Sequence, residues 1–332
     1  MDPADGPLGA GRPEIGDNGA HIMTLGTILC PVDFSEQSQQ ALRWAGALAW
    51  RYNSRLVVLT AVDPLLARAA RMRLGLDLAK VETEPELRLF VRSVLPDATG
   101  APQALIEVGV GNASEVILRA AEREAADLLV LGTHGLGGFQ KVLLGSTTEQ
   151  VLRRTKKPVL AVPLNLGAQA VALDAAGPRF ALSRIMVATD FSEPSAMACR
   201  WAGTLAGELG GSLLLIHVVA PLAVAPRWRS HVVEVDAERV RLARERLDAV
   251  LRDQPASVEH ETAVSVGRPA ESISSMAAER GVALIVMGLT GQSGQAIRPG
   301  SIAYRVLTLS HVPVLVVPSY EQETGVTAQA AQ

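Results

Sequence analysis

The sequence predicts an α/β protein made of two tandem, doubly wound, Rossmann-like domains, each a parallel sheet with helices on both faces. Three observations support this fold class. Short apolar runs alternate with segments whose apolar residues recur at helical spacing along most of the 332 residues. The chain repeats itself, because residues 28–64 align without gaps on residues 185–221. Its composition, 48% hydrophobic and 20% charged, is that of a globular protein, and its length suits about two domains.

Composition divides the chain into five segments. Residues 1–23 are rich in Gly, Pro and Ala without periodicity, and we expect a flexible leader there. The two repeated domains are expected at 24–165 and 183–319. An Ala- and Gly-rich linker, 166–182, should join them, and a polar tail, 320–332, should follow.

Strands and helices alternate through the first domain. Strands are expected at 27–32, 56–62, 104–108, 127–131 and 159–162, and helices near 35–49, 84–95 and 112–124 and from 146 onward. Residues 65–82 show no clear periodicity and contain three clustered arginines. The simplest interpretation of this cluster is a solvated face, and a lid over a ligand is the alternative.

Charge and composition exclude several functions. The net charge of −3 and the 4% aromatic content do not favour nucleic-acid binding, which needs basic side chains and rings for stacking. Cys30 and Cys199 are not in a CxxC motif and are expected to be reduced, buried thiols. No apolar run is long enough to span a bilayer, and the N-terminus lacks the core of a secretory signal. We therefore expect a cytoplasmic protein without a nucleic-acid or membrane partner.

The most informative stretch is a glycine-rich loop between a predicted strand and a predicted helix. It consists of Gly132, Thr133, His134 and Gly135, then nine residues, then Gly145 and Ser146. Glycines let the backbone approach a phosphate, and the free N–H groups at a helix start can hold it. Ser146 and Glu149 have capping-box spacing, and Thr147 and Thr148 follow with further hydroxyl donors. The order of strand, loop and helix predicts an anion site; the alternative is a surface loop without a ligand.

The spacing separates this loop from two common nucleotide motifs. It is neither a Walker A loop nor a Gly-x-Gly-x-x-Gly fingerprint. Gly-x2-Gly-x9-Gly-Ser resembles the nucleotide loop of the universal stress protein family, in its ATP-binding branch. Residues 157–163 are similar to that family's closing strand.

The resemblance implies a five-stranded parallel sheet of order 3-2-1-4-5 in each domain. Ligands of such sheets bind where the strand order reverses, so Asp33 and Gly132 should face one crevice. It implies ATP as the ligand, with Mg²⁺ as a possible companion, Asp33 at the adenosine end and Ala61 beside the base. The alternative role of Asp33 is an N-cap or turn residue ahead of Ser35, and both roles are compatible.

We expect binding rather than catalysis. His134 has no identifiable carboxylate partner, so we interpret it as a loop residue near phosphate rather than a general base. The leading interpretation is an ATP-binding stress-response protein with a regulatory or protective role. The alternatives are a nucleotide-free scaffold, or a slow ATP-hydrolysing or adenylyl-transferring enzyme, although neither an SGGxDS loop nor an HxGH pair is present.

The second domain keeps part of the pattern and changes the rest. The retained or equivalent positions are Asp190, Val218, Gly288, Gly291, Gly300 and Ser301. The spacer has eight residues, and Arg298 and Pro299 precede Gly300. Proline removes an N–H and fixes φ next to the phosphate-binding glycine, while Arg298 could offer phosphate a charge. Ala283 stands at the position of Asp127. We expect weak or absent nucleotide binding in this domain.

The last strand of each domain should lie against the other. Residues 159–162 and 314–317 are continuous apolar runs, which would be aggregation-prone as exposed edges. In the resembled family, domains dimerise through this strand. We therefore expect an intrachain pseudo-dimer, and a homodimer of whole chains stays open.

Overall fold

The computed structural model describes residues 13–15, 21–133, 144–163, 170–222, 229–291 and 301–319. The first domain contains β3 (Thr27–Pro31), α1 (Glu36–Tyr52), β4 (Arg55–Val62), α2 (Pro64–Leu74), the short π-helix Ala79–Thr83, α3 (Glu84–Val94), β5 (Ala104–Val110), α4 (Ala113–Arg123), β6 (Leu128–Gly132), α5 (Ser146–Arg154) and β7 (Val159–Val162). The second contains β10 (Arg184–Ala188), α6 (Glu193–Leu209), β11 (Ser212–Val219), α7 (Arg229–Leu251), β12 (His260–Val266), α8 (Pro269–Glu279), β13 (Leu284–Gly288), α9 (Ile302–Leu309) and β14 (Val314–Val317).

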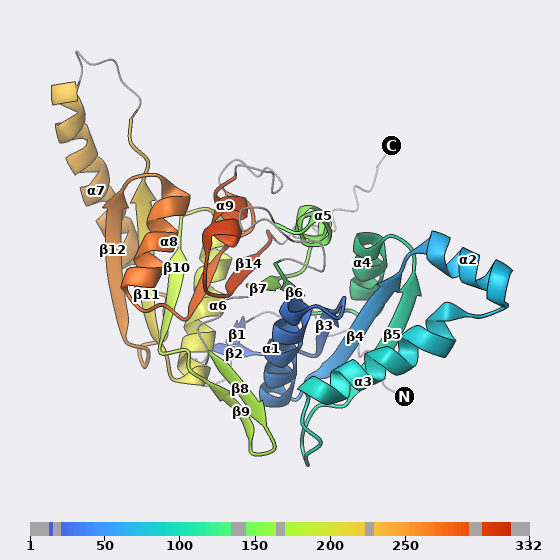
Figure 1. The fold of residues 1–332 in the computed structure, drawn as a ribbon. Helices are drawn as coiled ribbons and strands as arrows, with labels where there is room; N and C mark the ends of the chain where they lie inside the picture. Colours follow the sequence, from blue (N-terminus) through green and yellow to red (C-terminus); the bar gives the residue numbers. More distant parts are fainter. Residues whose placement is uncertain are drawn as a thin grey trace, which may run out of the picture.

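The strands of both domains form one sheet (Figure 1). Its ten strands run in the order β12-β11-β10-β13-β14-β7-β6-β3-β4-β5. Within each half all pairs are parallel, and the strands of each domain follow the expected order 3-2-1-4-5. The predicted fold class is confirmed.

The two halves join through their last strands. β14 pairs with β7 in the antiparallel sense, and Leu315 lies opposite Leu160. The expected pairing within the chain is thus confirmed. Leu160 and Leu315 lie in the core on one face of the sheet, whereas Ala161 and Val314 lie in the core on the other. Both faces of the junction are buried, which explains why these strands have continuous apolar sequences.

Helices cover both faces. α1, α3, α6 and α7 pack on one face, and α4, α5, α8 and α9 pack on the other. Each face carries one core cluster that continues across both domains. Fully burying one Leu or Ile contributes about 1.5–3 kcal/mol, so these layers supply the main stabilisation of the sheet. Of the helices in the described ranges, none combines the length and the apolar character needed to cross a bilayer.

Two short hairpins differ from the expected leader and linker. β1 (Pro13–Ile15) and β2 (His21–Met23) form one, and β8 (Val171–Asp174) and β9 (Gly177–Phe180) form the other. The β1–β2 hairpin contacts α6 of the second domain, where the backbone N–H of Met23 donates to Glu208 Oε1 at 3.1 Å. The β8–β9 hairpin contacts α1 of the first domain, with the rings of Phe180 and Trp44 6.3 Å apart. The hairpin that precedes each domain therefore packs on the first helix of the other domain.

A helix also replaces part of the segment expected to be irregular. α2 begins after Asp63, whose carboxylate accepts from the backbone N–H groups of Leu65 and Leu66 at 2.7 and 3.2 Å. Pro64 occupies its first turn, and Gly75 ends it in the left-handed conformation. No residue of α2 is buried, so the helix has no apolar face for periodicity to reveal.

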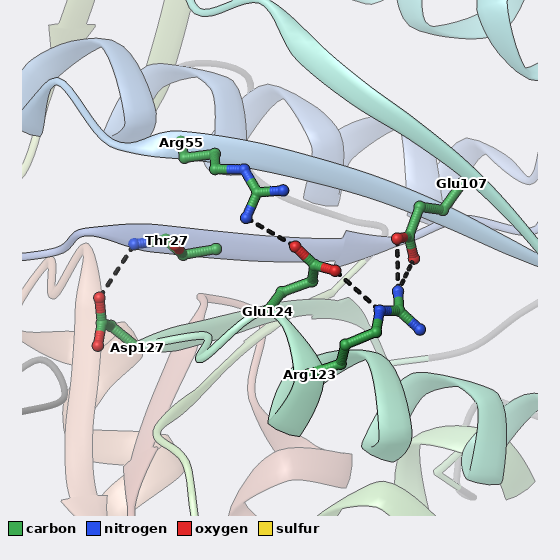
Figure 2. A network of polar contacts seen from close by, with 6 residues as sticks. All are labelled: Thr27, Arg55, Glu107, Arg123, Glu124 and Asp127. Atoms are coloured by element: carbon green, nitrogen blue, oxygen red, sulfur yellow. Dashed lines mark hydrogen bonds and ion pairs between the residues drawn. The ribbon is translucent and has the colours of Figure 1, made fainter. Parts of the chain in front are cut away.

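A polar network holds the starts of the strands in the first domain. Figure 2 shows Asp127 beside Thr27, whose N–H donates to Asp127 Oδ2 at 3.0 Å. The same oxygen accepts from Gly26 N at 2.7 Å. Asp127 precedes β6, whereas Gly132 ends it, so this carboxylate lies at the far end of the strand from the glycine loop. The difference between Asp127 and Ala283 in the two domains therefore bears on the anchoring of the strand starts.

The rest of this network consists of ion pairs. Glu124 pairs with Arg55 at 2.6 Å and with Arg123 at 2.8 Å, and Arg123 also bonds Glu107 (Figure 2). The hydrogen bonds from Arg123 and Arg55 lower the pKa of the Glu124 carboxyl. These partly exposed pairs fix the register of neighbouring elements and contribute little net stability.

Candidate functional site

The expected switch point lies between β3 and β6. These strands are neighbours, and from them the chain continues to opposite sides of the sheet. Asp33 follows β3, Ala61 lies near the end of β4, and Gly132 ends β6. Because the strands are parallel, the three residues lie at one edge of the sheet, where α/β proteins bind their ligands.

A strained turn positions Asp33. Its Oδ1 accepts from Ser35 N at 3.1 Å and from the Ser35 hydroxyl, and Ser35 in turn caps α1. Phe34 between them has φ 65°, an uncommon conformation for a bulky residue, and its ring packs edge-on against Phe90 at 5.4 Å. Asp33 thus has the local turn role that we gave as the alternative. Its side chain stays half-buried at the sheet edge, so the two roles are compatible.

The start of α5 differs from the predicted capping box. The N-cap is Gly145, in an extended conformation with φ −58° and ψ 139°, and it has no side chain that could cap this end. The Gly145 N–H donates to Thr133 O at 2.8 Å, which holds the glycine beside the end of β6. Glu149 pairs with Arg153 at 2.7 Å instead of reaching back to the helix start. The capping box between Ser146 and Glu149 was therefore a wrong prediction.

The hydroxyl groups after Gly145 have different environments. Thr148 is buried, and its Oγ1 donates to Gly132 O at 2.8 Å, which ties the helix to the end of β6. Ser146 is exposed and Thr147 is half-buried. Thr148 therefore positions the loop, and Ser146 and Thr147 are the hydroxyl residues placed toward solvent. His134 and Gly135 lie outside the described residues, as do Arg298 and Gly300 of the second domain.

In the second domain the corresponding residues surround a pocket of about 470 Å³. All predicted second-site residues in the described ranges line it, namely Asp190, Val218, Gly288, Gly291 and Ser301. A methyl group built on Gly291 would lie 2.8 Å from Asp190 Oδ2, so a larger residue here would require the carboxylate to shift. The carboxylate and the glycines are thus brought together as expected.

Sequence reasoning missed His217 in this pocket. Its Nδ1 lies 2.8 Å from Thr189 O, and because a carbonyl only accepts, Nδ1 carries the proton. The ring packs on Phe191 at 4.6 Å between centroids, and the Arg246 guanidinium lies 4.0 Å from the Phe191 ring centroid. The repeat alignment carried the signal, because His217 stands at the position of Thr60, whose Oγ1 donates to the equivalent carbonyl at 2.8 Å.

At the start of α9, the side chain of the N-cap residue caps the helix. Ser301 is the N-cap, and its Oγ accepts from Tyr304 N at 3.3 Å. Ser301 aligns with Ser146, which is inside α5. Ile302 and Ala303 follow, where the first domain has Thr147 and Thr148. The two helix starts therefore differ in both capping and hydroxyl content.

Metal ligands and reactive thiols do not gather in the described ranges. No group of three His, Cys, Asp or Glu residues there could hold a metal ion. Cys30 and Cys199 are free and buried, and burial raises the pKa of both thiols.

Comparison with known proteins gives a consistent result. The model of the Universal stress protein family matches residues 24–163 and 182–318. A universal stress protein of Mycolicibacterium smegmatis is 25% identical over 300 residues, covering 87% of this chain and 96% of its own. The universal stress protein MJ0577 of Methanocaldococcus jannaschii is 30% identical over 156 residues, 41% of this chain and 93% of its own. The crystal structure of a universal stress protein from Archaeoglobus fulgidus has a TM-score of 0.58 at 21% identity, covers 88% of this chain and 98% of its own, and shows the shared fold.

Proposed function

The chain belongs to the universal stress protein family, and on that premise we propose that its first domain binds ATP. The protein would act in the cytoplasm as a nucleotide-responsive regulatory or protective module of a stress response. Binding, rather than turnover, is the proposed activity.

The observation that carries this proposal is the uncapped start of α5 at the switch point. The first N–H groups of a helix have no acceptor within the helix, and at α5 the N-cap glycine has no side chain to supply one. Gly145 keeps side-chain bulk away from these groups, and the helix dipole favours an anion there. Ser146 and Thr147 add hydroxyl donors on the exposed side. This chemistry fits a phosphate chain.

The remaining roles combine the positions of Asp33, Ala61 and Gly132 at the ends of the strands with the glycine motif of the sequence. Asp33 would accept from the ribose hydroxyls, and Ala61 would lie beside the base. The backbones of Gly132, Gly135 and Gly145 would surround the phosphates, with His134 close to them. Thr148 would hold this arrangement through its bond to Gly132. Mg²⁺, which commonly combines one or two carboxylates with phosphate oxygens and water, would be held here mainly by the nucleotide.

Titration calorimetry of nucleotide-free protein tests the proposal. We expect about one tightly bound ATP per chain. Gly145→Val should abolish that binding, because a β-branched side chain blocks the approach of phosphate to the helix start. Gly300→Val, at the equivalent position of the second domain, is the matched control and should leave the stoichiometry near one. Unchanged binding in the Gly145 variant would place the site elsewhere.

A further inference from the structure

The pocket of the second domain has a composition that does not suit a nucleotide. We propose that it binds an uncharged nucleoside, a base and ribose without phosphate. The inference goes beyond the proposed function and uses it only in taking ATP as the ligand of the first domain.

The pocket has the size and walls of a small-molecule site. Its volume of about 470 Å³ lies within the roughly 300–1,000 Å³ usual for such sites. Its walls are largely aliphatic, formed by Ala188, Ile216, Val218, Ile273, Met287 and Leu289. A planar base is buried favourably between such walls.

Three hydroxyl residues at the proposed phosphate end of the first domain have apolar counterparts in the second. Leu289, Ile302 and Ala303 stand where the first domain has Thr133, Thr147 and Thr148. All three line the pocket, so apolar atoms face the space where phosphate oxygens would lose water. The Ser301 hydroxyl also accepts from Tyr304 N, one of the N–H groups that an anion would need. The lining residues in the described ranges include no Lys or Arg.

The polar groups that remain suit a nucleoside. Asp190 lines the pocket, and its carboxylate can accept hydrogen bonds from several donors. Ribose hydroxyls are donors of the right kind. His217 is also among the lining residues, and its Nδ1–H is bonded to Thr189 O. Packing on Phe191 fixes the orientation of this ring.

A matched pair of full-length variants separates the two sites. Ala61→Phe blocks the base position of the first domain, and Val218→Phe blocks the equivalent position of the second. Adenosine and ATP are titrated into each variant by calorimetry, and near-ultraviolet circular dichroism confirms that each variant is folded. In Ala61→Phe we expect one adenosine site, with ATP bound at least ten-fold more weakly. In Val218→Phe we expect one ATP site, with adenosine bound at least ten-fold more weakly.

A third variant tests the chemistry without filling the pocket. Ile302→Thr restores the hydroxyl group that Thr147 supplies in the first domain, and combined with Ala61→Phe it should move the preference of the second site toward ATP by about ten-fold. Adenosine binding to Ala61→Phe together with no ATP binding to Val218→Phe would support this inference and reject the proposed function. Tighter binding of ATP than of adenosine to Ala61→Phe, or no adenosine binding to that variant, would overturn the inference. The proposed function is tested separately, by whether Val218→Phe binds ATP.

Discussion

Ser146 and Ser301 occupy equivalent positions in the two copies, yet the structure gives them different tasks. Ser301 caps α9 through its side chain, whereas Ser146 lies in the first turn of α5 behind a glycine cap. We therefore predict that alanine at these two positions changes different properties of the protein. Ser301→Ala should lower stability and leave ATP binding unchanged, and Ser146→Ala should lower ATP affinity and leave stability unchanged.

The magnitudes follow from the hydrogen bonds. Replacing a serine N-cap by alanine costs about 0.5–2 kcal/mol, and the length of the Ser301–Tyr304 bond, 3.3 Å, favours the lower half of that range. Ser146 is exposed and caps nothing, so Ser146→Ala should change the free energy of unfolding by less than about 0.5 kcal/mol. A hydrogen bond from its hydroxyl to a charged phosphate is worth about 1.5–3 kcal/mol, so ATP affinity should fall roughly ten-fold or more.

Urea unfolding and titration calorimetry measure both quantities on the same preparations. Midpoints and slopes are compared at one protein concentration without nucleotide, and ATP is then titrated into each variant. If Ser146→Ala lowered the midpoint as much as Ser301→Ala, the serine would be a cap in both copies. If ATP affinity were unchanged in Ser146→Ala, its hydroxyl would not contact the ligand, and the reasoning would fail at that step.

Three further predictions concern the scaffold. Leu160→Ala at the junction of the two half-sheets should lower the free energy of unfolding by about 2–5 kcal/mol in urea titrations, because Leu160 is 3% exposed; a change below 1 kcal/mol would contradict tight packing there. Asp127→Ala should lower the free energy of unfolding by about 1–3 kcal/mol, because two backbone N–H groups lose their acceptor, and ATP affinity should not change. Loss of ATP binding at unchanged stability would show instead that Asp127 takes part in the ATP site. Burial raises the pKa of Cys199 to about 12 and that of Cys30 further, so a disulfide reagent at pH 8 should label neither thiol until urea unfolds the protein, and fast labelling of native protein would show that the thiols are accessible.

The sheet could be predicted from the sequence because each strand is a short apolar run and the same runs recur in both domains. Parallel strands buried on both faces have continuous apolar sequences, and β3, β6 and β7 all show this pattern. The internal repeat then gave the second domain, and the need to cover two apolar edges gave the pairing of β7 with β14. α2 was missed because none of its residues is buried, so only its caps mark it.

The two hairpins, β1–β2 and β8–β9, are elements that could not be predicted from the sequence. β1 and β2 have three residues each, which is too short for any periodicity, and the packing partner is α6, far away in the sequence. The same holds for β8 and β9 on α1. Their composition, rich in Gly, Pro and Ala, is that of a linker. Each hairpin packs on a helix of the other domain, and the pairing of the two halves brings that helix within reach.

The helix starts show why the site was harder to predict than the sheet. Ser146 and Ser301 follow glycines at equivalent positions, yet only Ser301 is the N-cap. A glycine cap is only a few tenths of a kcal/mol less stable than a serine cap, because water reaches the uncovered N–H groups. Stability therefore hardly distinguishes the two arrangements, and the sequence need not favour either. The first domain can keep an uncapped helix start for a phosphate at almost no cost to the fold, and the second can close the same start with one hydroxyl. The two copies can thus differ in ligand while sharing one sheet.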